Sequence, residues 1–189
     1  MASSASRSIS NHDAVVMKTA DDAVKAKHAA VEAGYYQDPF IGSFATTVQR
    51  NQPVQVIIKR GTFARVACVE KAITRFIRTV LHHTEADDVS KVVPQLVILG
   101  AGKDTTFFRL LQMDLLEEDG EAQLGWFEVD HEEMIHQKIS IIERCGKTFG
   151  ATVTECDRQS GVYELGSAGE GTDPWPASCH LISHDLNGD

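Results

Sequence analysis

The sequence has 189 residues, of which 42% are hydrophobic and 24% are charged. These values are ordinary for a globular protein with one sizeable core. The formal net charge is −9, from 27 acidic and 18 basic residues, which argues against a nucleic-acid partner because phosphate binding draws on clustered lysines and arginines.

The cysteines and the N-terminus give no sign of export or of a membrane anchor. Four cysteines without a C-x-x-C motif favour reduced thiols in a cytoplasmic protein over a disulfide framework or a zinc site. No apolar run is long enough to cross a membrane. Residues 1–12 are rich in serine and lack the apolar centre of a secretory signal, so we expect a disordered tail there.

Residues 13–90 are predicted to form an N-terminal helical region. Apolar residues recur at helical spacing from Asp13 to Ala33, and Gly34 marks a stop. Breaks follow at Pro39 and Pro53, and the clearest helix is predicted over residues 62–82. Its apolar stripe predicts packing against a large surface. The stripe consists of Phe63, Val66, Val69, Ile73, Phe76, Ile77 and Val80. Charged residues between 85 and 91 indicate a solvated connection.

Residues 91–189 are predicted to form an α/β domain. The apolar run at 96–99 ends in glycine and indicates a strand buried on both faces. A helix (105–116), a strand (126–130) and a second helix (132–145) follow. Residues 148–156 are ambiguous and are compatible with a third strand. Residues 160–178 are predicted to form a loop, and residues 180–186 a last strand.

The alternation of strand and helix predicts a Rossmann-like, doubly wound sheet. Such a sheet needs more strands and helices than these residues supply. We therefore expect a partial, truncated domain that follows a helical extension.

The turn after the first predicted strand is the strongest candidate for ligand binding. Gly100 and Gly102 lie between a strand and a helix, where glycine allows backbone to approach a ligand and the helix offers free N–H groups. A tight structural turn, with a cap from Asp104, Thr105 or Thr106, is the alternative. Asp130 ends the next predicted strand, where an acid can bind ribose hydroxyls or cap the helix that follows.

The identity of the third residue in the glycine pattern bears on the cofactor. Nicotinamide sites typically have the whole pattern G-x-G-x-x-G at the turn that binds a pyrophosphate. Thr105 takes that place here. The pattern therefore favours S-adenosylmethionine, which has adenosine but no phosphates, over a nicotinamide-dependent oxidoreductase.

Several motifs in the same order resemble the N-terminal part of the leucine carboxyl methyltransferases. They are Lys27 with Gly34–Ile41, then Lys59–Val66, Leu99–Leu110, Phe127–Asp130 and Ser183–Leu186. The similarity runs from about Asp13 to the end of the chain. In combination these motifs are much more specific than any one glycine pair.

The resemblance implies methylation of the C-terminal leucine carboxylate of the protein phosphatase 2A catalytic subunit, with S-adenosylmethionine as cofactor. It also implies roles for individual residues. Lys27 and Arg65 would contact the carboxylate of the cofactor or substrate, with Arg65 as the catalytic residue. Gly100 would approach the cofactor and Asp130 would hold its ribose. Asp185 and Leu186 would lie beside the adenine.

Each of these assignments has a structural alternative. Lys27 is compatible with a solvated helix position, Arg65 with a surface ion pair, and Asp185 with a turn cap. For the whole chain, the alternative is a non-catalytic fragment with a binding or regulatory role. We expect a monomer that does not associate with a membrane. We also expect no metal site, because His131 and His136 are five residues apart and lie on different sides of a helix.

Overall fold

The computed structural model describes residues 11–84, 94–113, 115–116, 124–157, 160–168 and 177–184. Residues 1–10 of the tail predicted at 1–12 and the predicted connection at 85–91 lie outside the described residues, whereas residues 11 and 12 belong to a helix. The N-terminal helices are α1 (Asn11–Glu32), α2 (Ile41–Phe44), α3 (Thr47–Asn51) and α4 (Val56–Thr84). The remaining elements are β1 (Gln95–Leu99), α5 (Thr106–Gln112), β2 (Leu124–Asp130), α6 (Glu132–Arg144), α7 (Gly146–Phe149), β3 (Ala151–Asp157), β4 (Val162–Ser167) and β5 (Ala177–Ser183).

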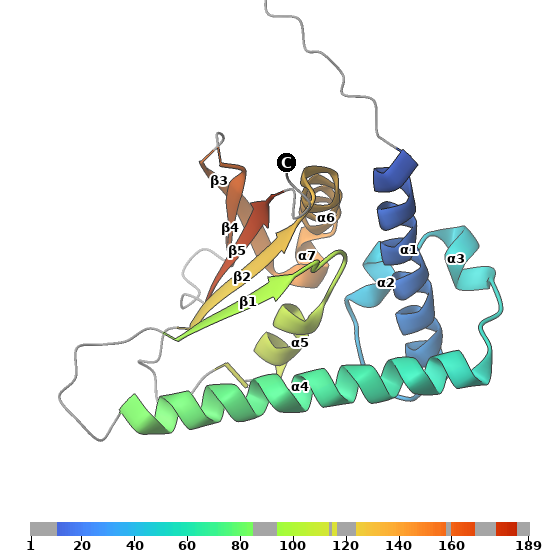
Figure 1. Ribbon diagram of the computed structural model, residues 1–189, viewed down its shortest axis with the longest axis horizontal. Coiled ribbons are helices and arrows are strands. Elements are labelled where there is room, and N and C mark those ends of the chain that lie inside the picture. Colours follow the sequence, from blue (N-terminus) through green and yellow to red (C-terminus); the bar gives the residue numbers. More distant parts are fainter. Residues whose placement is uncertain are drawn as a thin grey trace, which may run out of the picture.

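The strands form one five-stranded mixed sheet in the order β1-β2-β5-β4-β3. The α/β fold class predicted from the sequence is confirmed. β1, β2 and β5 are parallel, and their connections run through α5 and α6 (Figure 1). Leu99 at the end of β1 lies opposite Val129 of β2. The parallel register therefore brings the carboxyl ends of these two strands to the same edge of the sheet, where ligand sites of α/β folds lie.

The core lies between the sheet and the helices α5 and α6. Alternate residues of β2 point into it, and the Trp126 side chain is fully buried. The Phe107 ring of α5 packs on this indole, with ring centroids 5.5 Å apart. A second aromatic group connects α5 to the N-terminal region, because Phe108 contacts both Phe40 and Phe149. Burial of these large side chains provides most of the driving force for docking the helices.

β1 differs from the strand predicted at residues 96–99. Its residues alternate in exposure, and the Val97 and Leu99 side chains are 56% and 67% exposed. The prediction of a strand buried on both faces is therefore wrong. Among the described strands β1 occupies an edge of the sheet, and Leu96 and Ile98 on one of its faces pack against the core. A four-residue apolar run carries no signal that separates an edge strand from a central one.

The segment predicted as a loop at residues 160–178 contains β4, so that part of the prediction is wrong. β4 pairs antiparallel with both β3 and β5, and Leu165 is buried between them. Gly161 adopts a positive φ of 60° in the preceding turn. The glycines and serines of this segment are typical of a loop, and the apolar residues of β4 are too few to give a strand pattern. The third strand that the sequence left open at 148–156 exists as β3.

α4 is longer and more exposed than the helix predicted at residues 62–82. It begins at Val56, before Gly61, and runs along the base of the molecule below α1 and α5 (Figure 1). Ile73 and Ile77 are buried, whereas Phe63, Val69 and Phe76 are 37–46% exposed. The expectation that the whole stripe is packed is therefore wrong. Of the helices in the described ranges, none combines the length and apolarity that crossing a membrane requires.

Candidate functional site

The glycine loop, residues 100–105, connects β1 to α5 at the carboxyl edge of the sheet. Gly100 and Gly102 have φ values of 67° and 53°, a conformation that side chains with a Cβ disfavour. The Gly100 N–H donates a hydrogen bond to the Val129 carbonyl at 2.8 Å. A Cβ at Gly102 would lie 3.6 Å from the Ala20 Cβ of α1. Both glycines are therefore required by the backbone path of the loop.

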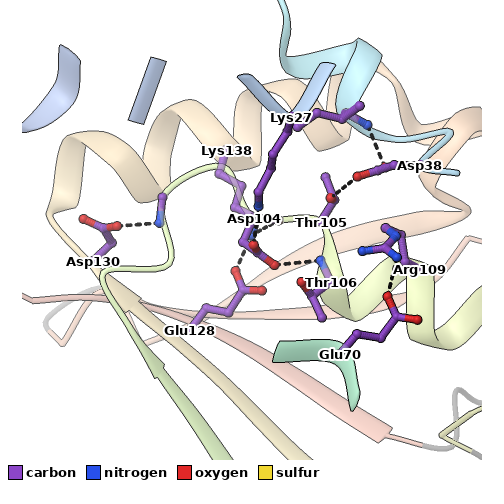
Figure 2. Close-up of polar contacts among 12 residues, drawn as sticks. Lys27, Asp38, Glu70, Asp104, Thr105, Thr106, Arg109, Glu128, Asp130 and Lys138 are labelled. Atoms are coloured by element: carbon purple, nitrogen blue, oxygen red, sulfur yellow. Dashed lines mark hydrogen bonds and ion pairs between the residues drawn. The ribbon is translucent and has the colours of Figure 1, made fainter. Parts of the chain in front are cut away.

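Asp130 ends β2 directly beside this loop, as Figure 2 shows. Its carboxylate is buried and accepts hydrogen bonds from the Gly102 N–H at 2.5 Å and the His131 N–H at 2.7 Å. Each carboxylate oxygen has a further lone pair to offer. The alternative role of Asp130 as a helix cap is met only in part, because the N–H that donates to Asp130 belongs to His131, the N-cap residue of α6.

Lys27 of α1 reaches the other end of the loop and pairs with Asp104. The Lys27 Nζ lies 2.5 Å from Asp104 Oδ2, while Asp104 Oδ1 accepts a hydrogen bond from the Thr106 N–H at 2.7 Å. Burial alone would raise the pKa of Asp104, but the charges of Lys27 and Lys138 outweigh it and hold that pKa well below its ordinary value. Asp104 is therefore ionised at neutral pH, and its carboxylate holds the first backbone N–H of α5.

A buried ion pair supports the loop from below. The Lys138 ammonium of α6 pairs with the Glu128 carboxylate of β2, and the two side chains are 0% and 1% exposed. Lys138 also donates to the Asp104 carbonyl at 2.7 Å, and the Trp126 indole donates to Glu128 at 3.1 Å. The sequence analysis missed this pair. The signal was available, because each charge interrupts an otherwise apolar face, Lys138 lying one turn from both Met134 and Ile142.

The segment that follows α1 is tied to the far side of the loop. Asp38 accepts hydrogen bonds from the Phe40 and Ile41 N–H groups at 3.0 Å, and from the Thr105 hydroxyl at 2.6 Å. Arg109 of α5 donates to the Gln37 carbonyl at 3.2 Å and pairs with Glu70 of α4 (Figure 2). The sequence analysis did not single out these residues as site residues.

A cavity of about 280 Å³ lies between α1, the glycine loop and the end of β2. It brings together three of the predicted site residues, Lys27, Gly100 and Asp130. It is lined by Thr19, Ala20, Ala23, Val24, Lys27, residues 100–104, Asp130 and Met134. We call it the glycine-loop cavity. Its lining combines a buried carboxylate, an ion pair and loop backbone, which suits a small polar ligand.

Of the other predicted residues, only Arg65 lies within the part of the chain that the structure describes. Arg65 is exposed on α4 and is not among the lining residues, although its charge is near enough to act on the Tyr36 hydroxyl. Asp185 and Leu186 lie outside the described residues. The His136 ring nitrogen lies 2.9 Å from the Tyr163 hydroxyl. Within the described ranges, no group of three or more histidine, cysteine or acidic side chains is placed to hold a metal ion.

Comparison with known proteins gives one consistent family. The family model described as leucine carboxyl methyltransferase matches residues 15–187. Leucine carboxyl methyltransferase 1 of Caenorhabditis elegans is 30% identical over 198 aligned positions, covering 96% of this chain and 54% of the relative. Its counterpart from Bos taurus is 34% identical, covering 69% of this chain and 34% of the relative. The Arabidopsis thaliana homolog is 32% identical with the same two coverages. The chain spans between about a third and about half of the length of these relatives.

Proposed function

The chain belongs to the leucine carboxyl methyltransferase family, and from this premise we propose that it binds S-adenosylmethionine in the glycine-loop cavity and takes part in methylating a C-terminal leucine carboxylate. One observation carries the proposal. Asp130, Lys27 and the two positive-φ glycines converge on one cavity from separate parts of the sequence. This arrangement supports a cofactor-binding loop over a tight strand-to-helix turn with a structural role alone.

The residues of the cavity fit the chemistry of this cofactor. Asp130 has free lone pairs for ribose hydroxyls beyond its two backbone hydrogen bonds. At the other end, Lys27 and Asp104 form a pair of opposite charges. An α-amino acid group also carries opposite charges, so Lys27 would bind its carboxylate and Asp104 its ammonium. Thr105 stands where nicotinamide sites typically have a third glycine.

The transfer would need positioning more than acid–base chemistry. When bound, S-adenosylmethionine supplies an electrophilic methyl group. A C-terminal carboxyl has an ordinary pKa of about 3.3–3.7, so it is ionised at neutral pH and no base is required. The protein therefore has to orient this carboxylate and exclude water, and such positioning lowers barriers by roughly 7–11 kcal/mol in favourable cases. We assign the orienting role to Arg65, whose guanidinium can hold a carboxylate through two hydrogen bonds.

We further propose the substrate and the setting that the sequence resemblance implies. The substrate is the C-terminal tail of the protein phosphatase 2A catalytic subunit, and the protein acts as a cytoplasmic monomer. The acidic net charge of −9 supports a protein partner over a nucleic acid.

The proposal is tested by methyl transfer with the 189-residue chain. The chain is incubated with methyl-labelled S-adenosylmethionine and a peptide that ends in a free leucine carboxylate. The control peptide has the same sequence and a C-terminal amide, which offers no carboxylate. We expect label in the first peptide only, and loss of it in Arg65→Ala. Cofactor binding without any transfer would favour the non-catalytic alternative, and no cofactor binding by the folded chain would contradict the proposal.

A further inference from the structure

α4 carries a charge opposite to that of the whole chain. The net charge of the chain is −9, yet α4 contains one acidic residue, Glu70, and several basic ones. The basic residues are Lys59, Arg60, Arg65, Lys71, Arg75 and Arg78. Three of these, Lys71, Arg75 and Arg78, are exposed and recur at helical spacing, so they lie on one face of the helix. Among the described residues no carboxylate forms an ion pair with any of the three.

This basic face borders a groove of about 800 Å³ between α4, α5 and the segment after α1. We call it the α4 groove. Its floor is mainly apolar, formed by Phe63, Val66 and Ala67 of α4 together with Met113 and Leu115. Phe63 and Met113 are 37% and 43% exposed. Exposed apolar side chains gathered in a groove with a charged rim are typical of a surface that binds a peptide or protein.

The α4 groove ends beside the loop network of the candidate site. Tyr36 and Arg109 line it, and the Arg109 guanidinium lies 5.0 Å from the centroid of the Tyr36 ring. The Tyr36 hydroxyl is buried and has no hydrogen-bond partner within the part of the chain that the structure describes. A buried hydroxyl without a partner is unfavourable, and a polar group of a ligand would satisfy it. Arg109 is bonded to Gln37, which connects the groove to the segment that holds Thr105.

We propose that the α4 groove binds an acidic peptide segment of the substrate protein, with its apolar side chains on the groove floor and its carboxylates facing Lys71, Arg75 and Arg78. This inference rests on the proposed function in that the bound segment belongs to the methyl acceptor. Charge complementarity identifies the occupant, because a basic rim attracts carboxylates and an apolar floor favours side chains such as leucine. A nucleic acid would offer phosphates to the basic rim but no aliphatic side chains to the apolar floor.

The test measures peptide binding directly, without cofactor or methyl transfer. The probe is a fluorescein-labelled peptide of about ten alternating glutamate and leucine residues, with a blocked carboxyl end, and binding to the 189-residue chain is followed by anisotropy. Lys71→Glu/Arg78→Glu is compared with Arg144→Glu/Lys147→Glu. Both double variants change the net charge equally, and all four side chains are exposed, but only the first pair borders the groove.

A second pair of variants tests the floor. Ala67→Trp fills the groove, whereas Ala72→Trp adds the same side chain at an exposed position of α4 outside it. We expect Lys71→Glu/Arg78→Glu and Ala67→Trp each to weaken binding about tenfold or more, and both controls to stay within about twofold of the unaltered chain.

Several results would overturn the proposal. These are equal losses in the test and control variants, equal binding of a peptide with glutamine in place of glutamate, and displacement of the probe by a short oligothymidine at the same affinity. The assay also separates this proposal from the proposed function. Peptide binding without cofactor binding would support the groove assignment and contradict the proposed function. Cofactor binding without peptide binding would support the cofactor site and contradict the groove assignment.

Discussion

The glycine-loop cavity and the α4 groove use charge in opposite ways. In and beneath the cavity, the lysines are largely buried and pair with carboxylates, as in Lys138 with Glu128 and Lys27 with Asp104. Along the groove the basic side chains are exposed, and Lys71, Arg75 and Arg78 have no ion-pair partner among the described residues. The segment after α1 connects the two regions, because Gln37 accepts a hydrogen bond from Arg109 of the groove and Asp38 accepts one from Thr105 of the loop.

This difference separates two physical tasks. A buried ion pair contributes little net stability, but removing one partner is costly, so the pair fixes the position of the backbone that it holds. Exposed charges are screened and mobile, and they act mainly on the rate and specificity of association with a charged partner. The cavity is therefore suited to one small ligand of fixed shape. The groove is suited to a flexible chain.

The largest expected effect is on the free energy of unfolding, when the removal of a lysine charge near the cavity is compared with the removal of one along the groove. Lys138→Met leaves the Glu128 carboxyl group buried without its partner, and we expect it to lower the free energy of unfolding by about 3–5 kcal/mol. Lys71→Met removes an exposed charge on α4 and should change stability by no more than about 0.5 kcal/mol. Urea denaturation followed by circular dichroism measures both.

The double variant Glu128→Leu/Lys138→Met sharpens this comparison. It removes both buried charges, so its stability should recover most of the loss seen in Lys138→Met. It also removes the hydrogen bond from Lys138 to the Asp104 carbonyl, so affinity for S-adenosylmethionine should remain reduced. A similar stability for Lys138→Met and Lys71→Met would show that the buried pair does not hold the loop.

A smaller effect is expected from adding one methyl group to the loop. Gly102→Ala and Gly150→Ala both place a side chain at a positive φ, 53° and 60° respectively, at a cost of about 1–2 kcal/mol each. Only Gly102 lines the cavity. Gly102→Ala should therefore weaken S-adenosylmethionine binding about tenfold, since backbone approach to the ligand is obstructed. Gly150→Ala should leave binding unchanged. Calorimetric titration of S-adenosylmethionine into the two variants measures this difference. Equal affinities would contradict the assignment of the glycine-loop cavity as the cofactor site.

The smallest expected effect is in the pH dependence of Asp104. Its pKa is lowered in the folded protein, because Lys27 and Lys138 outweigh the effect of burial. Its contribution to stability is therefore fully present above its ordinary pKa of 3.8, and is lost as pH falls further toward the folded-state value. The stability difference between the unaltered chain and Asp104→Asn should be constant from pH 8 to about pH 5. A difference that shrinks between pH 8 and pH 6 would contradict this assignment.

Much of the parallel half of the fold was predictable from the sequence. The apolar run before Gly100 and the acid that ends the next strand define two parallel strands with helices between them, and both features were found in the structure. The edge position of β1 was not predictable, because an edge and a central strand have the same short apolar run. β4 was missed because Gly161 and its serine-rich neighbours resemble a loop in composition.

The candidate site was predictable only where a residue type carries its own signal. Glycines at a strand end and an acid at the next strand end identified Gly100 and Asp130. Glu128 and Lys138 are 10 positions apart, and their pairing depends on how α6 packs on the sheet. Tertiary packing also set the partner of Lys27, which is Asp104 of the loop. The roles assigned to Arg65, Asp185 and Leu186 remain predictions.

The most direct measurement is calorimetric titration of S-adenosylmethionine into the unaltered chain, Asp130→Asn and Asp157→Asn. Asp130 faces the cavity and accepts the Gly102 N–H, whereas Asp157 is an exposed residue at the end of β3. We predict binding to the unaltered chain and to Asp157→Asn with equal affinity, and a loss of about tenfold or more in Asp130→Asn. Equal affinity in all three, or no binding by the folded unaltered chain, would contradict the assignment of the glycine-loop cavity as the cofactor site.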